Sequence, residues 1–156
     1  MRVITVRQPW AWAIVRGGKD VENRTRNIAG SYRGPVAIHA GLRYDHEATQ
    51  PVRDMVGYTR FPDLPHTWNR SRWALGAIIG VVELVDVHEP DAFPDGRPFC
   101  WPDGWVTGTM CSPWAMDGHR HLELANPRAV APIPAKGKLG LWRPDAELLA
   151  QIEAAL

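Results

Sequence analysis

The sequence predicts an α+β fold, and three observations favour that class. Several short strand-like runs and three short helical patterns occur without the regular strand–helix alternation of a doubly wound sheet. Residues 76–88 form a nearly continuous apolar run, which indicates a strand buried on both faces, as in a small barrel. The chain has 156 residues with no internal repeat and no linker, so we expect one domain that covers residues 1–156.

The other elements are predicted from local signals. Residues 3–7 are predicted to form a strand, and residues 9–16 a helix whose first turn accommodates Pro9. Within residues 45–58, Pro51 indicates that a helix starts there or is broken. Further strands are expected at residues 34–41, 119–124, 129–133 and 138–142, a helix at residues 145–156, and polar or irregular segments at residues 22–26, 27–31, 61–72 and 89–118.

The composition excludes several classes of protein. Hydrophobic residues make up 45% and charged residues 22%, as in ordinary globular domains. No run approaches the ~20 apolar residues of a membrane helix, and the N-terminus lacks the apolar region of a signal peptide. We therefore expect an intracellular, cytoplasmic protein without a membrane partner. Cys100 and Cys111 are isolated, so the spacing indicates neither a disulfide framework nor a zinc site, and no cofactor is expected.

The charge is unevenly distributed although the chain as a whole carries only +1. Residues 1–75 carry 12 Lys and Arg against 6 Asp and Glu, a balance of +6, whereas residues 76–156 carry 6 against 11, a balance of −5. The basic half could form a patch that attracts phosphates in a salt-dependent way, or the two halves could neutralise each other in the fold. Of the 18 basic residues, 15 are Arg and three are Lys: Lys19, Lys136 and Lys138.

A short stretch after the first predicted helix gathers several charged groups. Gly17 and Gly18 favour the end of that helix, where a residue with positive φ is wanted. They bring Lys19 to a turn. If the chain is extended after this turn, Glu22 and Arg24 share one face. A cation, a carboxylate and a guanidinium therefore lie within six residues.

This stretch, Gly17-x-Lys19-x-x-Glu22-x-Arg24, matches the G-x-K-x-x-E-x-R signature of the ASCH domain, and the chain is identified as resembling that family. Val6-Arg7-Gln8-Pro9-Trp10-Ala11 resembles the strand-to-helix junction of bacterial and phage members. Asn126-Pro127-Arg128 and Pro134-x-x-Gly137-x-Leu139-Gly140-Leu141-Trp142 resemble the closing strands. The resemblance covers most of the chain and implies a small PUA-like β-barrel with flanking helices.

The resemblance also implies a pocket centred on Lys19 and Glu22. In that pocket, Lys19 would pair with Glu22 or with a substrate phosphate, and Arg24 would lie beside them. A buried lysine that has lost its proton would instead be a candidate base or nucleophile. The alternative is an ordinary ion pair that ties the turn to the barrel.

Other polar and aromatic side chains are candidates for the same pocket. Gln8 could read a base edge and Trp10 could stack on a base, with Arg7 next to them in the sequence; the alternative for Trp10 is core packing. His39 is either a hydrogen-bonded core residue or a ligand-binding one. Asn126 could line the pocket or serve turn chemistry. His119 and His121 alternate onto one strand face and could form a metal pair, but no third ligand is evident.

The leading functional hypothesis is a domain that binds RNA or a modified nucleoside through Arg7, Gln8, Trp10, Arg24, His39 and Asn126, with Lys19 and Glu22 at the centre. The first alternative is an amidohydrolase that removes an acyl group from N4-acylated cytidine. The chain resembles that branch at Lys19 but has Glu22 where the branch typically has Thr, and Glu83, Glu89, Asp117 or Glu123 could supply its second carboxylate. The second alternative is a metal-independent ribonuclease that uses Lys19 with a nearby His. The sequence does not indicate an oligomeric state.

Overall fold

The computed structural model describes residues 1–57, 73–101, 104 and 107–156, and its centre is a curled six-stranded sheet that forms a half-barrel. The loop expected at residues 61–72 lies outside the described residues. In chain order the elements are β1 Arg2–Gln8, α1 Trp10–Arg16, β2 Val21–Arg24, β3 Gly34–Tyr44, α2 Thr49–Val56, β4 Ala77–His88, β5 Asp91–Ala92, β6 Pro98–Phe99, β7 Arg120–Pro134, β8 Leu141–Trp142 and α4 Ala146–Ala154.

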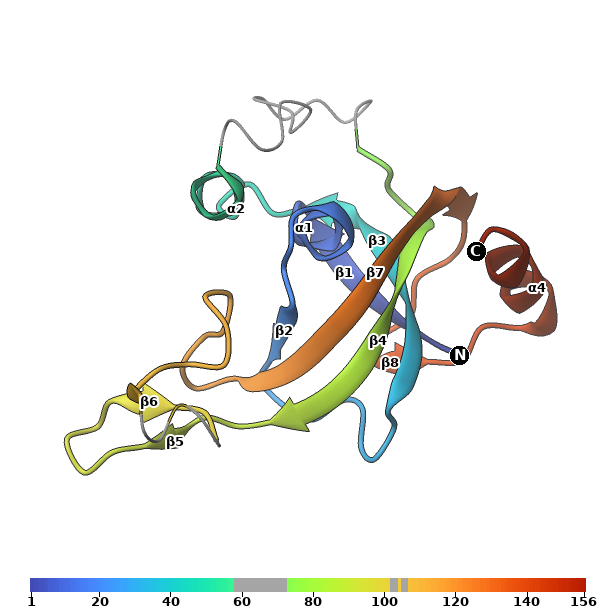
Figure 1. Cartoon of the computed structure of the whole chain (residues 1–156). Coiled ribbons are helices and arrows are strands. Elements are labelled where there is room, and N and C mark those ends of the chain that lie inside the picture. The colour runs from blue at the N-terminus through green and yellow to red at the C-terminus, as the bar shows by residue number, and fades with distance from the viewer. Residues whose placement is uncertain (58–72, 102–103, 105–106) are drawn as a thin grey trace.

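The strand order of the sheet is β2-β7-β4-β3-β1-β8. Strands β1 and β3 are parallel, and the other neighbouring pairs are antiparallel. The long strands β4 and β7 cross the molecule together as a bent ribbon (Figure 1). Three register irregularities interrupt their pairing, and such bulges increase the local twist and bend of a ribbon. The sheet can therefore curl around its core.

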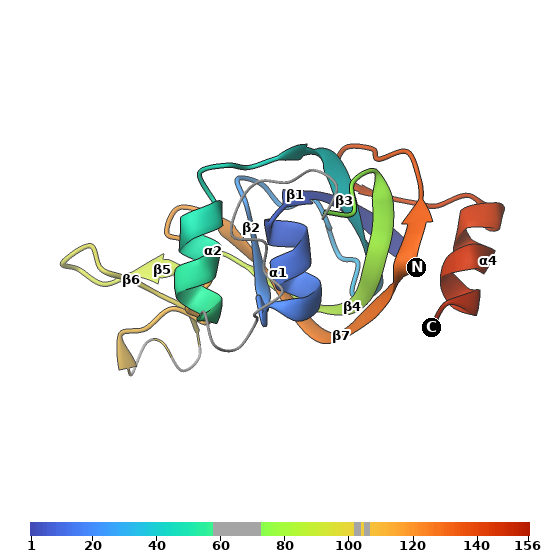
Figure 2. The ribbon, with the colours of Figure 1, turned by 90° about the horizontal axis from the view of Figure 1, so that it is seen from above.

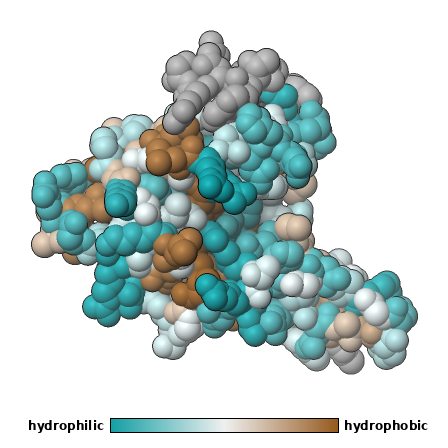
Figure 3. Space-filling model, turned by 180° about the vertical axis from the view of Figure 1, so that it is seen from behind, coloured by the Kyte–Doolittle hydropathy of each residue, from teal (hydrophilic) through white to brown (hydrophobic). Residues whose placement is uncertain are grey.

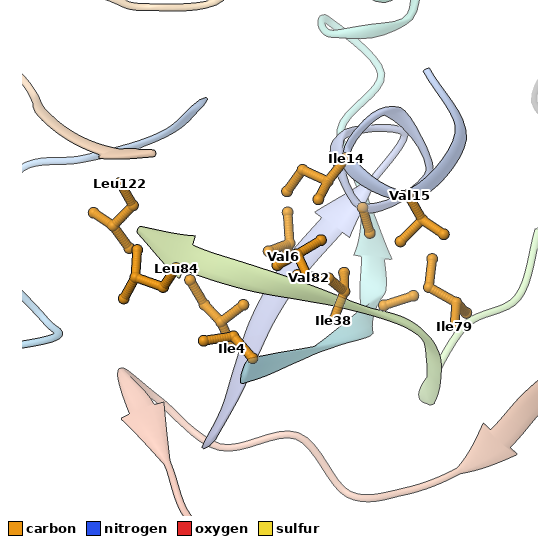
Figure 4. Close-up of a cluster of buried hydrophobic side chains, with 12 residues drawn as sticks. Ile4, Val6, Ile14, Val15, Ile38, Ile79, Val82, Leu84 and Leu122 are labelled. Atoms are coloured by element: carbon orange, nitrogen blue, oxygen red, sulfur yellow. The ribbon is translucent and has the colours of Figure 1, made fainter. Parts of the chain in front are cut away.

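Strand β4 is buried on both faces, which confirms the prediction from its apolar run. Val82 and Leu84 pack with Ile14 and Val15 of α1 in one core cluster, together with side chains of β1 and β3 (Figure 4). Ile78 and Val81 belong to a second cluster on the opposite face of the sheet, which also contains Ile152 of α4. Because α1 and α4 cover opposite faces, an alternating polar pattern would not suit this strand.

Helix α1 lies unusually close to the ribbon at Gly80. A Cβ atom at this position would lie 2.7 Å from Cγ1 of Val15 and 2.8 Å from the carbonyl oxygen of Arg128. Only glycine fits between the helix and the neighbouring strand. The approach fixes the end of α1, and with it the turn that carries Lys19.

Several sequence-based boundaries differ from the structure: the strand expected at residues 138–142 is limited to Leu141–Trp142, and two other differences have a clear physical reason. The strands predicted at residues 119–124 and 129–133 are one strand, β7. Asn126, with φ of 51°, lies in an irregularity of this strand and accounts for the polar interruption in its sequence. Helix α2 begins at Thr49, so that Pro51 lies in its first turn, where a missing N–H costs nothing.

The segment between β4 and β7 leaves the sheet as a small hairpin, β5–β6, which projects from one end of the molecule (Figures 1 and 2). Helix α4 lies at the opposite end (Figure 2). Among the described helices, none combines the length and the apolar character that a bilayer crossing requires.

Candidate functional site

The turn after α1 holds Lys19 in a defined place. The backbone N–H groups of Gly17 and Lys19 both donate to the carbonyl of Ala13, at 2.8 and 3.0 Å. Gly18 has φ of 73°, as the sequence predicts, but Gly17 does not have positive φ. Gly17 is required by proximity instead, because a Cβ atom there would lie 2.8 Å from the Cα of Ala13. Gly17 is therefore required because a Cβ atom does not fit there, whereas Gly18 is required for its positive φ.

Lys19, Glu22 and Arg24 form a largely buried ion-pair network, which we call the charged triad. Lys19 Nζ lies 3.2 Å from one carboxylate oxygen of Glu22, and Arg24 lies 3.0 Å from the other. Lys19 also donates to the carbonyl of Val21, and Arg24 donates to the carbonyl of Thr5 at 3.1 Å. Lys19 and Glu22 are only 4% and 8% exposed, so both carboxylate oxygens are neutralised by pairing rather than by water.

Trp10 covers the charged triad from the start of α1. Its ring faces the Lys19 ammonium at 5.7 Å, and its indole N–H donates to Asp45 at 3.2 Å. It also meets Trp114 edge to face, with ring centroids 6.4 Å apart. Trp10 therefore combines a cation–π contact with two fixed neighbours.

A cavity of about 540 Å³, which we call the small cavity, adjoins the triad. Its lining includes Trp10, Lys19 and Glu22 from the signature region and residues 113–116 from the segment before β7. Asn23 fastens that segment, because its amide donates to the carbonyl of Trp114 at 2.8 Å and accepts from the N–H of Met116 at 3.0 Å. His119 and Asp45 also line the small cavity.

A larger cavity of about 1140 Å³, which we call the basic cavity, opens on the other side of Glu22. Residues of β1, β2 and β3 line it together with residues 134–140. Among the described residues, its lining contains four cationic side chains, Arg7, Arg24, Lys136 and Lys138, and one carboxylate, Glu22. Seen from behind, the surface has apolar patches that lie among hydrophilic side chains (Figure 3). The two cavities share Trp10, Glu22 and Asn23.

His39 contributes a buried imidazole to the basic cavity. Its Nε2 lies 3.0 Å from the carbonyl oxygen of Ala135, and because a carbonyl only accepts, Nε2 carries the hydrogen. Nδ1 is buried and has no hydrogen-bond partner within the described part of the chain. Burial lowers the pKa of His39, so the ring is held neutral with an acceptor nitrogen beside Gly137.

The model of the ASCH domain family matches residues 4–133 of the chain. This range includes the residues of both cavities described above except the segment 134–140. The chain belongs to the ASCH domain family. This is a family of PUA-like folds associated with RNA binding. No protein in a comparison with curated sequences matches it.

Two solved structures resemble this ASCH domain over nearly its whole length. One is the crystal structure of a mutant of the ZmASCH protein from Zymomonas mobilis, with a TM-score of 0.53, 15% identity, and coverage of 99% of this chain and 98% of that chain. The other is the crystal structure of ASCH from the same organism, with a TM-score of 0.49, 14% identity, and coverage of 99% and 95%. At this identity the first likeness supports the fold alone.

Two of the predicted site residues lie elsewhere in the ASCH domain. The Gln8 side chain is 1% exposed, donates to the carbonyl of Ala74 at 3.1 Å and accepts from the N–H of Trp12 at 3.0 Å, so its amide is not free to read a base. Asn126 is exposed and lines neither the small nor the basic cavity. Gln8 is close to Trp10 in the sequence, but its side chain turns into the protein, and Asn126 lies in the irregularity of β7.

The sequence did not single out Asn23 and Asp45, which come from separate segments. The sequence did offer one usable signal, the three lysines in a chain whose other basic residues are all Arg. Lys19 lines the small cavity, and Lys136 and Lys138 line the basic cavity. The structure separates His119 from His121, the two histidines that the sequence offered as a metal pair. His119 contacts the carbonyl of Asp117, whereas His121 lies with His88, Cys100 and Cys111, and one ligand atom from each of these four lies within 4.8 Å of the others.

Proposed function

We propose that this ASCH domain binds single-stranded RNA, with the phosphates in the basic cavity and a base in the small cavity, or binds a modified nucleoside with its base in the small cavity. The observation that carries the proposal is the charge of the basic cavity. Within the described lining, four cations against one carboxylate, itself paired with two cations, leave a positive surface that attracts phosphates.

The small cavity has the size and the aromatic and polar side chains that a nucleobase site requires. Its volume of about 540 Å³ lies within the usual range for small-ligand sites. Trp10 and Trp114 offer aromatic surface, and Asp45 and Asn23 offer polar groups that can orient a ring edge. Because the two cavities share Trp10 and Asn23, one nucleotide can contact both at once.

The geometry of Lys19 supports binding more than nucleophilic catalysis. Its ammonium donates to Glu22 and to the carbonyl of Val21 and faces the ring of Trp10. A nucleophile needs a free lone pair directed at its substrate, whereas the Lys19 amine is engaged in these three contacts. In the proposed function, Lys19 and Glu22 orient a ligand rather than attack it.

The amidohydrolase hypothesis keeps one supporting observation, because Lys19 and Glu22 both line the nucleoside-sized small cavity. His119 lines it as well, which is the corresponding observation for the ribonuclease. Incubation with N4-acetylcytidine and with a labelled RNA separates the three functions. We expect retention of RNA without turnover; deacylation or strand cleavage that Lys19→Ala abolishes would replace the binding proposal with the respective enzyme.

The binding experiment is a titration of a fluorescent single-stranded RNA at several salt concentrations. If all four cations contact phosphates, the affinity falls about 50-fold between 50 and 200 mM salt, at ~0.7 units of slope per contact for single strands. Lys136→Ala with Lys138→Ala should lower the slope by about 1.4 units. Arg143→Ala is the matched control, since Arg143 is exposed but lines neither cavity. Affinity independent of salt and of both lysines contradicts the proposal.

A further inference from the structure

Two histidines and two cysteines converge where the β5–β6 hairpin leaves the sheet. His88 ends β4 and is the register partner of His121 on β7. Cys100 directly follows β6, and Cys111 lies in the segment that returns to β7. One ligand atom from each residue lies within 4.8 Å of the other three. Two imidazoles and two thiols form the donor set of tetrahedral structural zinc sites.

The spacing of the donor atoms fits a tetrahedron around zinc. With Zn–S near 2.3 Å and Zn–N near 2.0–2.1 Å, a sulfur and a nitrogen of one tetrahedron lie about 3.6 Å apart. Nδ1 of His121 lies 3.5 Å from Sγ of Cys100 and 3.3 Å from Sγ of Cys111. These two pairs need to change by only a few tenths of an ångström to share one ion.

His121 presents the correct nitrogen. Its Nε2 lies 2.9 Å from the carbonyl oxygen of Met116. Because the carbonyl can only accept, Nε2 carries the hydrogen and Nδ1 directs a lone pair toward both sulfurs. Metal-binding histidines are commonly oriented in this way by a carbonyl or carboxylate on the opposite nitrogen.

His88 is oriented by carboxylates. Its Nδ1 lies 3.2 Å from Asp86 and 3.5 Å from Glu123. Its Nε2 is buried and has no hydrogen-bond partner among the residues that the structure describes. A buried polar atom without a partner is costly. Coordination of a metal by Nε2 removes that cost, and the two carboxylates then supply the outer support of the ligand.

We propose that His88, Cys100, Cys111 and His121 bind one Zn²⁺. Four protein ligands complete the tetrahedron, so the ion is structural and leaves no position for a substrate. On binding, the two thiols release their protons to solvent, and the two thiolates balance the charge of the ion. The site ties the β5–β6 hairpin and the segment after it to the ends of β4 and β7. Through Met116 it also steadies the wall of the small cavity.

The test uses the tag-free full chain, reconstituted with Zn²⁺ under reducing conditions and freed of loosely bound metal. We expect one zinc per chain by elemental mass spectrometry. Replacement by Co²⁺ should give the intense visible bands of a tetrahedral thiolate site. Cys111→Ser and His88→Asn should lose both signals, whereas His119→Asn should keep them, because His119 is a neighbouring histidine outside the cluster.

A second variant tests the site without removing a ligand, in case a ligand variant does not fold. Asp86→Asn keeps all four ligands and should weaken zinc binding by about 10–100-fold in a chelator competition, the usual effect of losing an outer carboxylate. The melting temperature of the unaltered chain should fall when a chelator is added. Wild-type protein without stoichiometric zinc, a six-coordinate Co²⁺ spectrum, or a Cys100–Cys111 disulfide under reducing conditions overturns the proposal.

Discussion

The edge of the sheet formed by β2, β7 and β4 carries a polar cluster on each face, and the two clusters differ in how completely their polar groups are paired. Glu22 is the register partner of Leu122, so it points to the inner face, toward the core. Asn23 is the partner of His121, and His121 of His88, so this row of side chains points to the outer face. Glu22 and Asn23 are neighbours in β2 and therefore point to opposite faces. We call the charged triad the inner cluster, and His88, Cys100, Cys111 and His121 the outer cluster.

The inner cluster is internally complete. Each oxygen of the Glu22 carboxylate has its own cation, and Lys19 has two acceptors and an aromatic face. The outer cluster is incomplete: within the described residues, two thiols share one acceptor, Nδ1 of His121, and Nε2 of His88 has no hydrogen-bond partner. A complete network resists change, whereas the proposed Zn²⁺ would give the unpaired nitrogen of His88 a partner and would replace the two thiol hydrogens.

The largest expected effect is in the inner cluster. Glu22→Gln should lower the free energy of unfolding by about 3–5 kcal/mol, because it leaves two cations without their shared carboxylate in a buried site. Lys19→Met should cost clearly less, since Glu22 then keeps Arg24. Urea unfolding of both variants measures the difference. Equal losses would mean that Glu22 is not the centre of the triad.

The next effect concerns the turn that carries Lys19. Gly17→Ala should cost up to about 3 kcal/mol, because its Cβ would lie 2.8 Å from the backbone of Ala13 and α1 would have to shift. Gly18→Asn is the control: nothing lies within 4 Å of a Cβ there, and asparagine tolerates positive φ. Thermal unfolding compares the two variants. RNA titration of the Gly17 variant should also show weaker binding if Lys19 moves with the turn.

A smaller effect is expected from Asn23, which fastens the segment at Trp114 and Met116 to β2. Asn23→Ala removes two hydrogen bonds to the segment at Trp114 and Met116, so we expect a loss of about 2 kcal/mol, about 1 per bond. Amide hydrogen exchange should accelerate in residues 113–116 and remain unchanged in β1 and β3. An equal acceleration throughout the sheet would contradict a local role for Asn23.

The smallest effect is a pH dependence from His39. Its folded pKa is lowered by burial, so the unfolded chain takes up a proton more readily below the ordinary histidine value of about 6.5. The stabilising contribution is therefore present above that pH and is lost as pH falls through the folded pKa. His39→Gln should flatten the decline in melting temperature between pH 8 and pH 5. Since the pKa of His121 is also lowered by burial, the variant must be compared with the unaltered chain.

The sequence determined the parts of the molecule that rest on local spacing. The apolar run of β4 required burial on both faces, and the alternation in β2 placed Glu22 and Arg24 on one side. The signature residues Gly17, Lys19, Glu22 and Arg24 were enough to suggest the family, which the match over residues 4–133 then established. These features involve residues a few positions apart, whose geometry follows from the period of a strand or the end of a helix.

The tertiary structure alone decided which distant segments meet. His88, Cys100, Cys111 and His121 are separated by 11, 10 and 9 residues, spacings that match no short metal motif, and only the β4–β7 register and the return of the hairpin unite them. In the same way, the curl of the sheet brings Lys136 and Lys138 to the cavity beside Arg24, while Gln8 turns into the protein to satisfy backbone groups. Such contacts depend on sheet register and curvature, which the packing of the whole chain sets and no local pattern encodes.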